Sequence, residues 1–273
     1  MSTRSLSPSL KSLLHPGSYT PFIITALALA VSLGSFLLGS GLTSLSNASL
    51  LAFGVALTPV TVKWWLERRY WGTGATALSI LLVLQGLHTL EHIAQVVQYY
   101  LLGWPAGRSL GLVTAANAEW LHFAWNAGVL AGVIFLFAKG LRNKWMVALL
   151  GWALLHTLEH SYLLLRYFQV LAELRTLGLA PVPALQSLPG VLGKDGLLSL
   201  SSWCGNLSGL TTAPRVLVHF WWNAGEIALL GLAARQGVPK LLGRTPLKQN
   251  LLKQNLLKQN ASRQNSPNQK ETL

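Results

Sequence analysis

The sequence is poor in charged residues and has a single cysteine. Asp, Glu, Lys and Arg make up 11% of the 273 residues, against about 25% in ordinary soluble domains. A soluble helical protein needs more charges than this on its outer faces, so that class is disfavoured. With Cys204 alone, an intrachain disulfide and any cysteine-based metal site are excluded.

Acidic residues are especially few, at 8 against 21 Lys and Arg, which gives a formal net charge of +13. The basic residues lie in loops and tails and do not form a patch interleaved with aromatic residues, so nucleic acid is not predicted as a partner. In a membrane protein such residues set the orientation instead. Their distribution predicts that both termini face the cytoplasm.

Long apolar runs dominate what remains. The chain is 51% hydrophobic with a mean hydropathy of +0.43, and several runs approach the roughly 20 residues needed to cross a bilayer. The predicted fold class is all-α: an integral membrane protein with six transmembrane helices in the lipid bilayer. The spans are expected at 20–40, 48–65, 76–102, 116–137, 145–170 and 216–234. Small size and short loops favour a bacterial cytoplasmic membrane.

These spans suggest a division of the chain into five parts. Residues 1–19 are predicted to be a flexible N-terminal arm, and 20–70 two supporting transmembrane helices. Repeat one covers 76–138, and repeat two covers 145–235 with a long outer loop at 171–214. Residues 236–273 are predicted to be a basic, disordered, low-complexity tail, because Leu-Lys-Gln-Asn recurs there three times at a period of five.

One five-residue motif occurs twice inside apolar runs. It reads His88-Thr-Leu-Glu91-His92 in the third span and His156-Thr-Leu-Glu159-His160 in the fifth. Positions i, i+3 and i+4 share one face of a helix, so each motif presents two imidazoles and a carboxylate together.

The span that follows each motif also repeats. His122 is followed by Trp125 and Asn126, and His219 by Trp222 and Asn223, at identical spacing. The third to sixth spans are therefore predicted to form an internally duplicated four-helix bundle. Six of the seven histidines would then lie in one layer of that bundle.

Ionisable side chains inside a bilayer are costly and mark candidate functional sites. A metal cation would neutralise the two carboxylates and use the imidazole lone pairs, so a dinuclear metal site is predicted. The expected metal ligands are His88, Glu91, His92, His122, His156, Glu159, His160 and His219. Asn126, Asn223 and Glu226 are expected to orient these ligands or bind a cofactor directly. Iron or copper is favoured and zinc is the alternative, because imidazole suits all three.

The predicted role is redox chemistry, as an oxidase, oxygenase or electron-transfer protein with a lipophilic or small-molecule substrate and an electron-transfer partner. One alternative is a transporter of metal ions or protons that uses the same residues. A second is a bis-histidine haem b protein, although two histidines at i, i+4 lie only about 6 Å apart along the helix axis. The inverted zinc-protease order His-x-x-Glu-His and a purely structural polar network are further alternatives. Membrane hydroxylases and desaturases also place histidines at i, i+4, but this chain lacks their His-His dipeptides, and no family is assigned.

Overall fold

The computed structural model describes residues 19–179, 188–201 and 209–242, and every regular element in these ranges is helical. The all-α prediction is therefore confirmed for this part of the chain. The predicted N-terminal arm, apart from its last residue, and the tail beyond residue 242 lie outside the described residues, as does Cys204.

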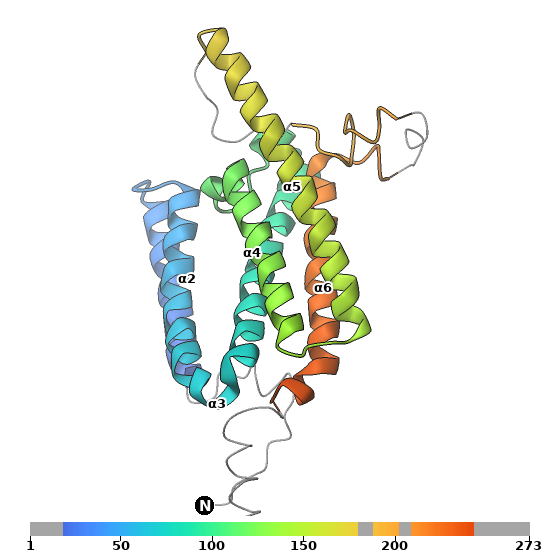
Figure 1. Cartoon of the computed structure of the whole chain (residues 1–273). Helices are drawn as coiled ribbons and strands as arrows, with labels where there is room; N and C mark the ends of the chain where they lie inside the picture. Colours follow the sequence, from blue (N-terminus) through green and yellow to red (C-terminus); the bar gives the residue numbers. More distant parts are fainter. Residues whose placement is uncertain (1–18, 180–187, 202–208, 243–273) are drawn as a thin grey trace, which may run out of the picture.

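Five long helices make up the fold, and Figure 1 shows their order. They are α2 (Thr20–Gly39), α3 (Leu45–Val96), α4 (Glu119–Ala138), α5 (Lys144–Thr176) and α6 (Arg215–Leu242). Three short helical turns lie between α3 and α4: η2 (Val97–Leu101), η3 (Ala106–Arg108) and η4 (Thr114–Asn117). Helix α6 continues to Leu242, seven residues beyond the end predicted from the sequence at 235.

Local sequence signals explain where these helices begin. The Ser44 side chain caps α3 by accepting a hydrogen bond from the backbone N–H of Asn47 at 3.3 Å. Asn143 caps α5 in the same way, accepting from the N–H of Met146 at 3.0 Å. Each cap satisfies a backbone donor that the first helical turn leaves without a partner.

Helix α3 changes direction at Gly72, whose φ of 77° and ψ of 165° are not helical. Only glycine adopts this backbone conformation without a steric penalty. The second and third predicted spans are therefore one continuous element with a sharp bend. We call residues 45–71 the first half of α3 and residues 73–96 its second half.

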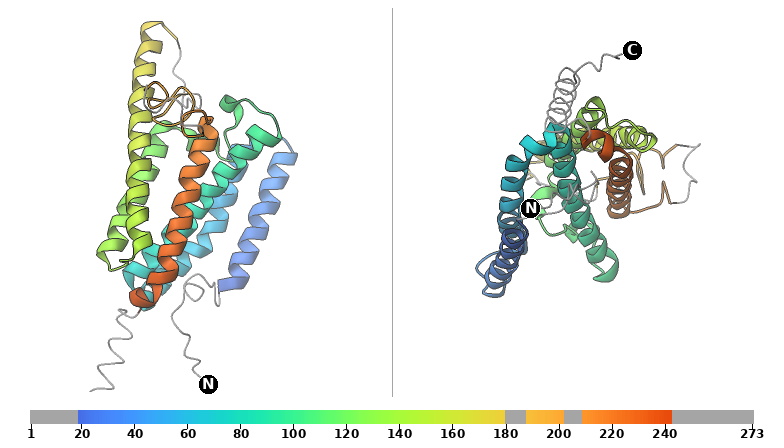
Figure 2. Two further views of the ribbon diagram at one scale, coloured as in Figure 1. Left: turned by 90° about the vertical axis from the view of Figure 1, so that its right-hand side faces the viewer. Right: turned by 90° about the horizontal axis from the view of Figure 1, so that it is seen from below.

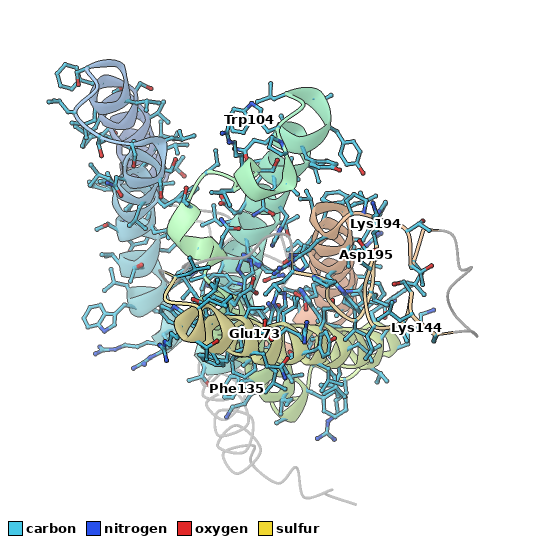
Figure 3. The ribbon with its side chains drawn as sticks, turned by 90° about the horizontal axis from the view of Figure 1, so that it is seen from above. Trp104, Phe135, Lys144, Glu173, Lys194 and Asp195 are labelled. Atoms are coloured by element: carbon cyan, nitrogen blue, oxygen red, sulfur yellow. The ribbon has the colours of Figure 1, made fainter. Side chains whose placement is uncertain are left out.

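The second half of α3 packs with α4, α5 and α6 as a four-helix bundle. Helix α2 and the first half of α3 form a hairpin beside this bundle. The view from below in Figure 2 shows that the hairpin projects away from the four helices. The loop that carries Lys194 and Asp195 lies beside the upper end of α6, as seen from above in Figure 3.

The lower part of the bundle, in the orientation of Figure 1, has an apolar core. Leu78, Val133, Leu149 and Leu230 come from four different helices, and each is at most 2% exposed. Above this level the interior becomes polar, because the histidine motifs occupy the upper part of each helix. The apolar core therefore closes the bundle beneath the histidines.

Five segments are long and apolar enough to cross a membrane. They are Thr20–Gly39, Leu45–Leu66, Arg68–Leu101, Glu119–Ala138 and Arg215–Pro239. Many of their apolar side chains face outward, including Phe22 at 67% and Ile24 at 61% exposure, which is compatible with contact with lipid. Helix α5, which contains His156, Glu159 and His160, is not among the five.

Candidate metal centre

Six imidazole rings converge in the upper part of the bundle. The second half of α3 contributes His88 and His92, α4 contributes His122, α5 contributes His156 and His160, and α6 contributes His219. Five of them are at most 3% exposed, and only His88 is partly exposed. The predicted convergence of these histidines is therefore present in the structure.

The first group, which we call the first triad, consists of His88, His92 and His122. Nε2 of His88 and Nε2 of His92 lie 3.3 Å apart. One ring nitrogen from each of the three residues lies within 4.8 Å of the other two. This arrangement could hold a metal ion.

The second triad consists of His156, His160 and His219, and among the described residues the first triad alone has ligand atoms that all lie within 4.8 Å of one another. Nε2 of His156 and Nε2 of His160 lie 3.2 Å apart, and the rings of His160 and His219 have their centroids 5.0 Å apart. The two triads touch, because the His122 and His160 rings stack at 5.3 Å with an interplanar angle of 12°.

Hydrogen bonds fix the tautomer of one histidine in each triad. Nδ1 of His92 lies 2.8 Å from Oε1 of Gln95, whose own amide nitrogen donates to Asn117. Nδ1 of His156 lies 2.9 Å from Oε1 of Glu226. The Gln95 oxygen can only accept, as can the Glu226 carboxylate when it is ionised, so each Nδ1 is then the donor and the Nε2 of the same ring faces the neighbouring histidine.

His122 of α4 and His219 of α6 each contribute one further buried ring nitrogen to the cluster. Nε2 of His122 and Nε2 of His219 are both buried and have no hydrogen-bond partner among the described residues. Buried polar atoms almost always have a partner, and an ion would provide one. Ligand atoms about 2.1 Å from a tetrahedral metal are roughly 3.4 Å apart, which is close to the two Nε2–Nε2 separations observed here.

The three residues predicted to orient the ligands lie one or two turns below the imidazoles. The side-chain amides of Asn126 and Asn223 each donate to the backbone oxygen of the histidine four residues earlier, at 2.9 Å. The Glu226 carboxylate contacts His156 directly. Glu226 is thus the one of the three that reaches a histidine ring.

Gln85 is a central residue that the sequence analysis missed. Its amide nitrogen donates to Oδ1 of Asn223 at 3.0 Å and to Oε2 of Glu226 at 2.6 Å. Its oxygen accepts from the Trp125 indole at 3.2 Å. Gln85 lies three residues before His88, on the same helix face, and this spacing was the available signal.

The carboxylates of the two motifs bind loop backbone. Glu91 accepts hydrogen bonds from the N–H groups of Leu112 and Val113, at 2.9 and 2.8 Å. Glu159 accepts from those of Val191 and Leu192, at 3.0 and 3.3 Å. We call these two arrangements the carboxylate clamps. Their role as metal ligands stays a prediction.

A glycine comes directly before the donors in each clamp. A Cβ atom placed on Gly111 or on Gly190 would collide with the bound carboxylate. Both loops therefore approach their glutamate at a residue without a side chain, which is a typical use of glycine.

An ion pair joins the upper ends of α4 and α6. Nη2 of Arg215 donates to both carboxylate oxygens of Glu119, at 2.8 and 3.0 Å. Glu119 lies three residues before His122, and Arg215 lies four residues before His219. The pair and the carboxylate clamps thus cover the imidazoles from above.

Comparison with protein-family models, with curated proteins and with solved structures found no match. The interpretation of this centre therefore depends on its geometry and chemistry alone.

Proposed function

We propose that this chain is a membrane-embedded metalloprotein that holds two transition-metal ions, one in each imidazole triad. The observation that carries the proposal is the set of buried ring nitrogens that face one another inside the bundle, with the Nε2 atoms of the two histidines of each motif only 3.3 and 3.2 Å apart. His92 and His156 keep their Nε2 lone pairs, and Nε2 of His122 and of His219 has no partner among the described residues. Imidazole lone pairs grouped in this way are the ligands that zinc, copper, iron and nickel prefer.

The proposal includes six membrane spans, with α5 as the sixth and both termini on the cytoplasmic side. Helix α5 has 33 residues, which corresponds to about 50 Å at a rise of about 1.5 Å per residue. Its polar motif faces the bundle interior, where His156, Glu159 and His160 are at most 3% exposed. Its outward residues include Leu154, Leu155 and Leu158, each about half exposed. This division is typical of a spanning helix with a functional interior.

The proposal also includes an internal duplication of the helix pairs α3–α4 and α5–α6. Matching positions make matching contacts: Trp125 lies 5.0 Å from His88, and Trp222 lies 5.2 Å from His156, between ring centroids. The carboxylate clamps match as well, down to the glycine before each donor pair. Agreement in contacts that the sequence motif alone does not require supports a common origin.

Redox chemistry is the role we infer, with copper or iron as the metal. A pair of adjacent ions can exchange electrons with a substrate or a partner protein while the surrounding helices exclude water. Among the described residues, the Glu226 carboxylate is the one acidic group in contact with the second triad. Because it supplies at most one negative charge, the site suits an ion of low charge. Imidazole ligands favour copper most strongly among the divalent first-row metals.

Transport of ions through the same residues is less well supported. A transport path needs polar groups toward both sides of the membrane. Below the imidazoles, the hydrogen-bonded Gln85, Asn223 and Glu226 give way to the apolar core around Leu78 and Leu230. A resident ion fits this closed arrangement better than a passing one.

A haem is also less well supported than separate ions. A bis-histidine haem needs a flat macrocycle between its two axial imidazoles. Rings from different helices already contact one another here, with His122 stacked on His160 and 5.7 Å from His92, between centroids. Two small ions fit between such rings without displacing helices.

Metal analysis of the purified protein tests the proposal. Wild type is expected to hold two ions per chain. The double variant His88→Ala with His92→Ala should hold one, as should His156→Ala with His160→Ala. Thr89→Ala is a matched control, because the Thr89 hydroxyl bonds only to the backbone oxygen of Gln85. Wild type without bound metal, or equal metal content in all four proteins, would reject the metal centre.

A spectroscopic measurement tests the redox role separately. Absorption and electron paramagnetic resonance spectra of the metal-loaded protein should change on addition of dithionite and recover in air. Bound metal with no response to reduction would identify a redox-inactive ion such as zinc and would reject the redox role while leaving the metal centre intact.

A further inference from the structure

A cavity of about 440 Å³ lies between the hairpin and the bundle. We call it the lateral chamber. Its outer wall comes from the first half of α3, through Leu50, Phe53 and Leu57, and its inner wall includes His88 and His122. Its volume is within the range of roughly 300–1,000 Å³ that is usual for small-molecule sites.

The walls of the lateral chamber are apolar except at the metal centre. Leu84, Leu87 and Leu121 line it from the bundle side. The polar residues in its lining are His88, Glu91, His122 and Trp125. The carboxylate of Glu91 and the indole N–H of Trp125 already have hydrogen-bond partners. Nε2 of His122 has none among the described residues, although that side chain is 97% buried.

The hairpin wall of the chamber is partly exposed, since Leu50 in that wall is 58% exposed. The hairpin consists of two apolar helices that are long enough to cross a membrane. In the proposed arrangement this wall is therefore surrounded by the hydrocarbon of the bilayer. A molecule dissolved in lipid can enter there without passing through water.

On the basis of the proposed metal centre, we propose that the lateral chamber binds an uncharged lipophilic molecule, an alkyl chain with one hydroxyl or carbonyl group. The alkyl chain contacts Phe53, Leu57 and Leu87, and the oxygen faces His88 and His122. Apart from the proposed ion, the lining offers no Lys or Arg to pair with an anionic head group and it contains the Glu91 carboxylate, so a neutral head group is favoured.

On the side of the second triad, the described residues include a pocket of about 300 Å³ that is lined by Trp152 and Trp222 and not by a histidine. Trp152 occupies the position that corresponds to Leu84, and its indole lies against Gly225 and contacts the Trp222 ring at 4.8 Å between centroids. Trp222 in turn stacks on His156, which is fully buried. The molecule bound in the chamber therefore meets the first triad alone.

Photoaffinity labelling with a diazirine-bearing n-decanol tests this site in lipid nanodiscs. Label is expected in the peptides that contain Leu57 and Leu121, and excess unlabelled n-decanol should displace it. Leu57→Trp places an indole in the chamber and should lower this labelling by about tenfold or more, because the added ring leaves no room for the alkyl chain. Leu51→Trp is the matched control, since Leu51 is 41% exposed and lies outside the chamber.

Metal content measured on the same samples separates the two proposals. Displaceable label that is lost in Leu57→Trp but kept in Leu51→Trp supports the chamber, with or without bound metal. Label that n-decanol does not displace reflects bulk lipid and overturns the site, as does equal labelling of both variants. Specific labelling of a wild-type protein that holds no metal would reject the metal centre and retain the chamber.

Discussion

The two halves of the imidazole cluster differ in what surrounds the first histidine of each motif. His88 is partly exposed and borders a cavity, whereas His156 is fully buried beneath the Trp222 ring. The supporting groups differ too. A neutral amide, Gln95, orients a histidine of the first triad, and a carboxylate, Glu226, orients one of the second.

Three of the positions that differ between the two helix pairs lie beside the imidazoles. Leu84 in the pair α3–α4 corresponds to Trp152 in the pair α5–α6. In the same way Gln85 corresponds to Ala153, and Val129 to Glu226. Two of these changes add an indole and a carboxylate beside the second triad, and the third places the Gln85 amide beside the first triad. The same ligand frame can therefore support a tightly held ion on one side and an accessible ion on the other.

The largest expected difference between the halves comes from Glu226. Replacing it by Leu removes the acceptor from Nδ1 of His156, and such partners typically contribute 10–100-fold to metal affinity. We expect Glu226→Leu to lower the affinity for one of the two ions by about that factor and to leave the affinity for the other unchanged. Titration with a competing chelator measures both affinities. Glu226→Gln keeps an acceptor and should restore most of the loss. Equal weakening of both ions would contradict the assignment of Glu226 to the second triad.

Substitution of the glutamate should have the same effect in both carboxylate clamps. This comparison tests whether the pairs α3–α4 and α5–α6 correspond. Glu91→Gln and Glu159→Gln each replace one of the two acceptor oxygens by an amide nitrogen and leave a backbone N–H without its acceptor, which costs about 1–3 kcal/mol. We expect each variant to lower the free energy of unfolding in detergent by about this amount while keeping both ions. Exposed Glu173→Gln is the control. Loss of an ion without loss of stability would instead identify these glutamates as metal ligands.

The smallest expected effect is that of Trp152→Leu, which should give the probe access to the second triad. This substitution makes the position equivalent to Leu84 and removes the indole that lies against Gly225. The diazirine-bearing n-decanol should then label peptides of α5 and α6 several-fold more than in wild type, with unchanged metal content. Trp120→Leu, at a position that is 57% exposed, is the control. An unchanged labelling pattern would show that Trp152 is not what closes the second triad.

The sequence predicted that the histidines come together, because helical spacing alone places them on common faces; their role as metal ligands stays a prediction. His88 and His92 share a face at any helix orientation, and the repeated order of the motifs indicated which helices face one another. It also predicted the supporting role of Glu226, from its position two turns beyond His219. These inferences need only the period of the helix.

Other features depended on chain segments whose course the sequence does not specify. The bonds between Glu91 and the backbone of Val113 require a particular loop path. Gln95 and Gln85 were overlooked because their partners, Asn117 and Asn223, come from elsewhere in the chain. Arg215 lies just before the predicted sixth span, and in the structure it starts α6 and pairs with Glu119.

The bend at Gly72 has a consequence for how wide the entrance to the metal centre can be. The hairpin and the bundle meet at this single residue along α3, and the Trp64 indole donates to the Ser79 hydroxyl across the bend at 3.0 Å. Any other L-amino acid at position 72 would favour a negative φ and would rotate the hairpin relative to the bundle. The aperture is thus governed by one backbone torsion about four helical turns below His88, so its size can change in evolution while every metal ligand stays in place.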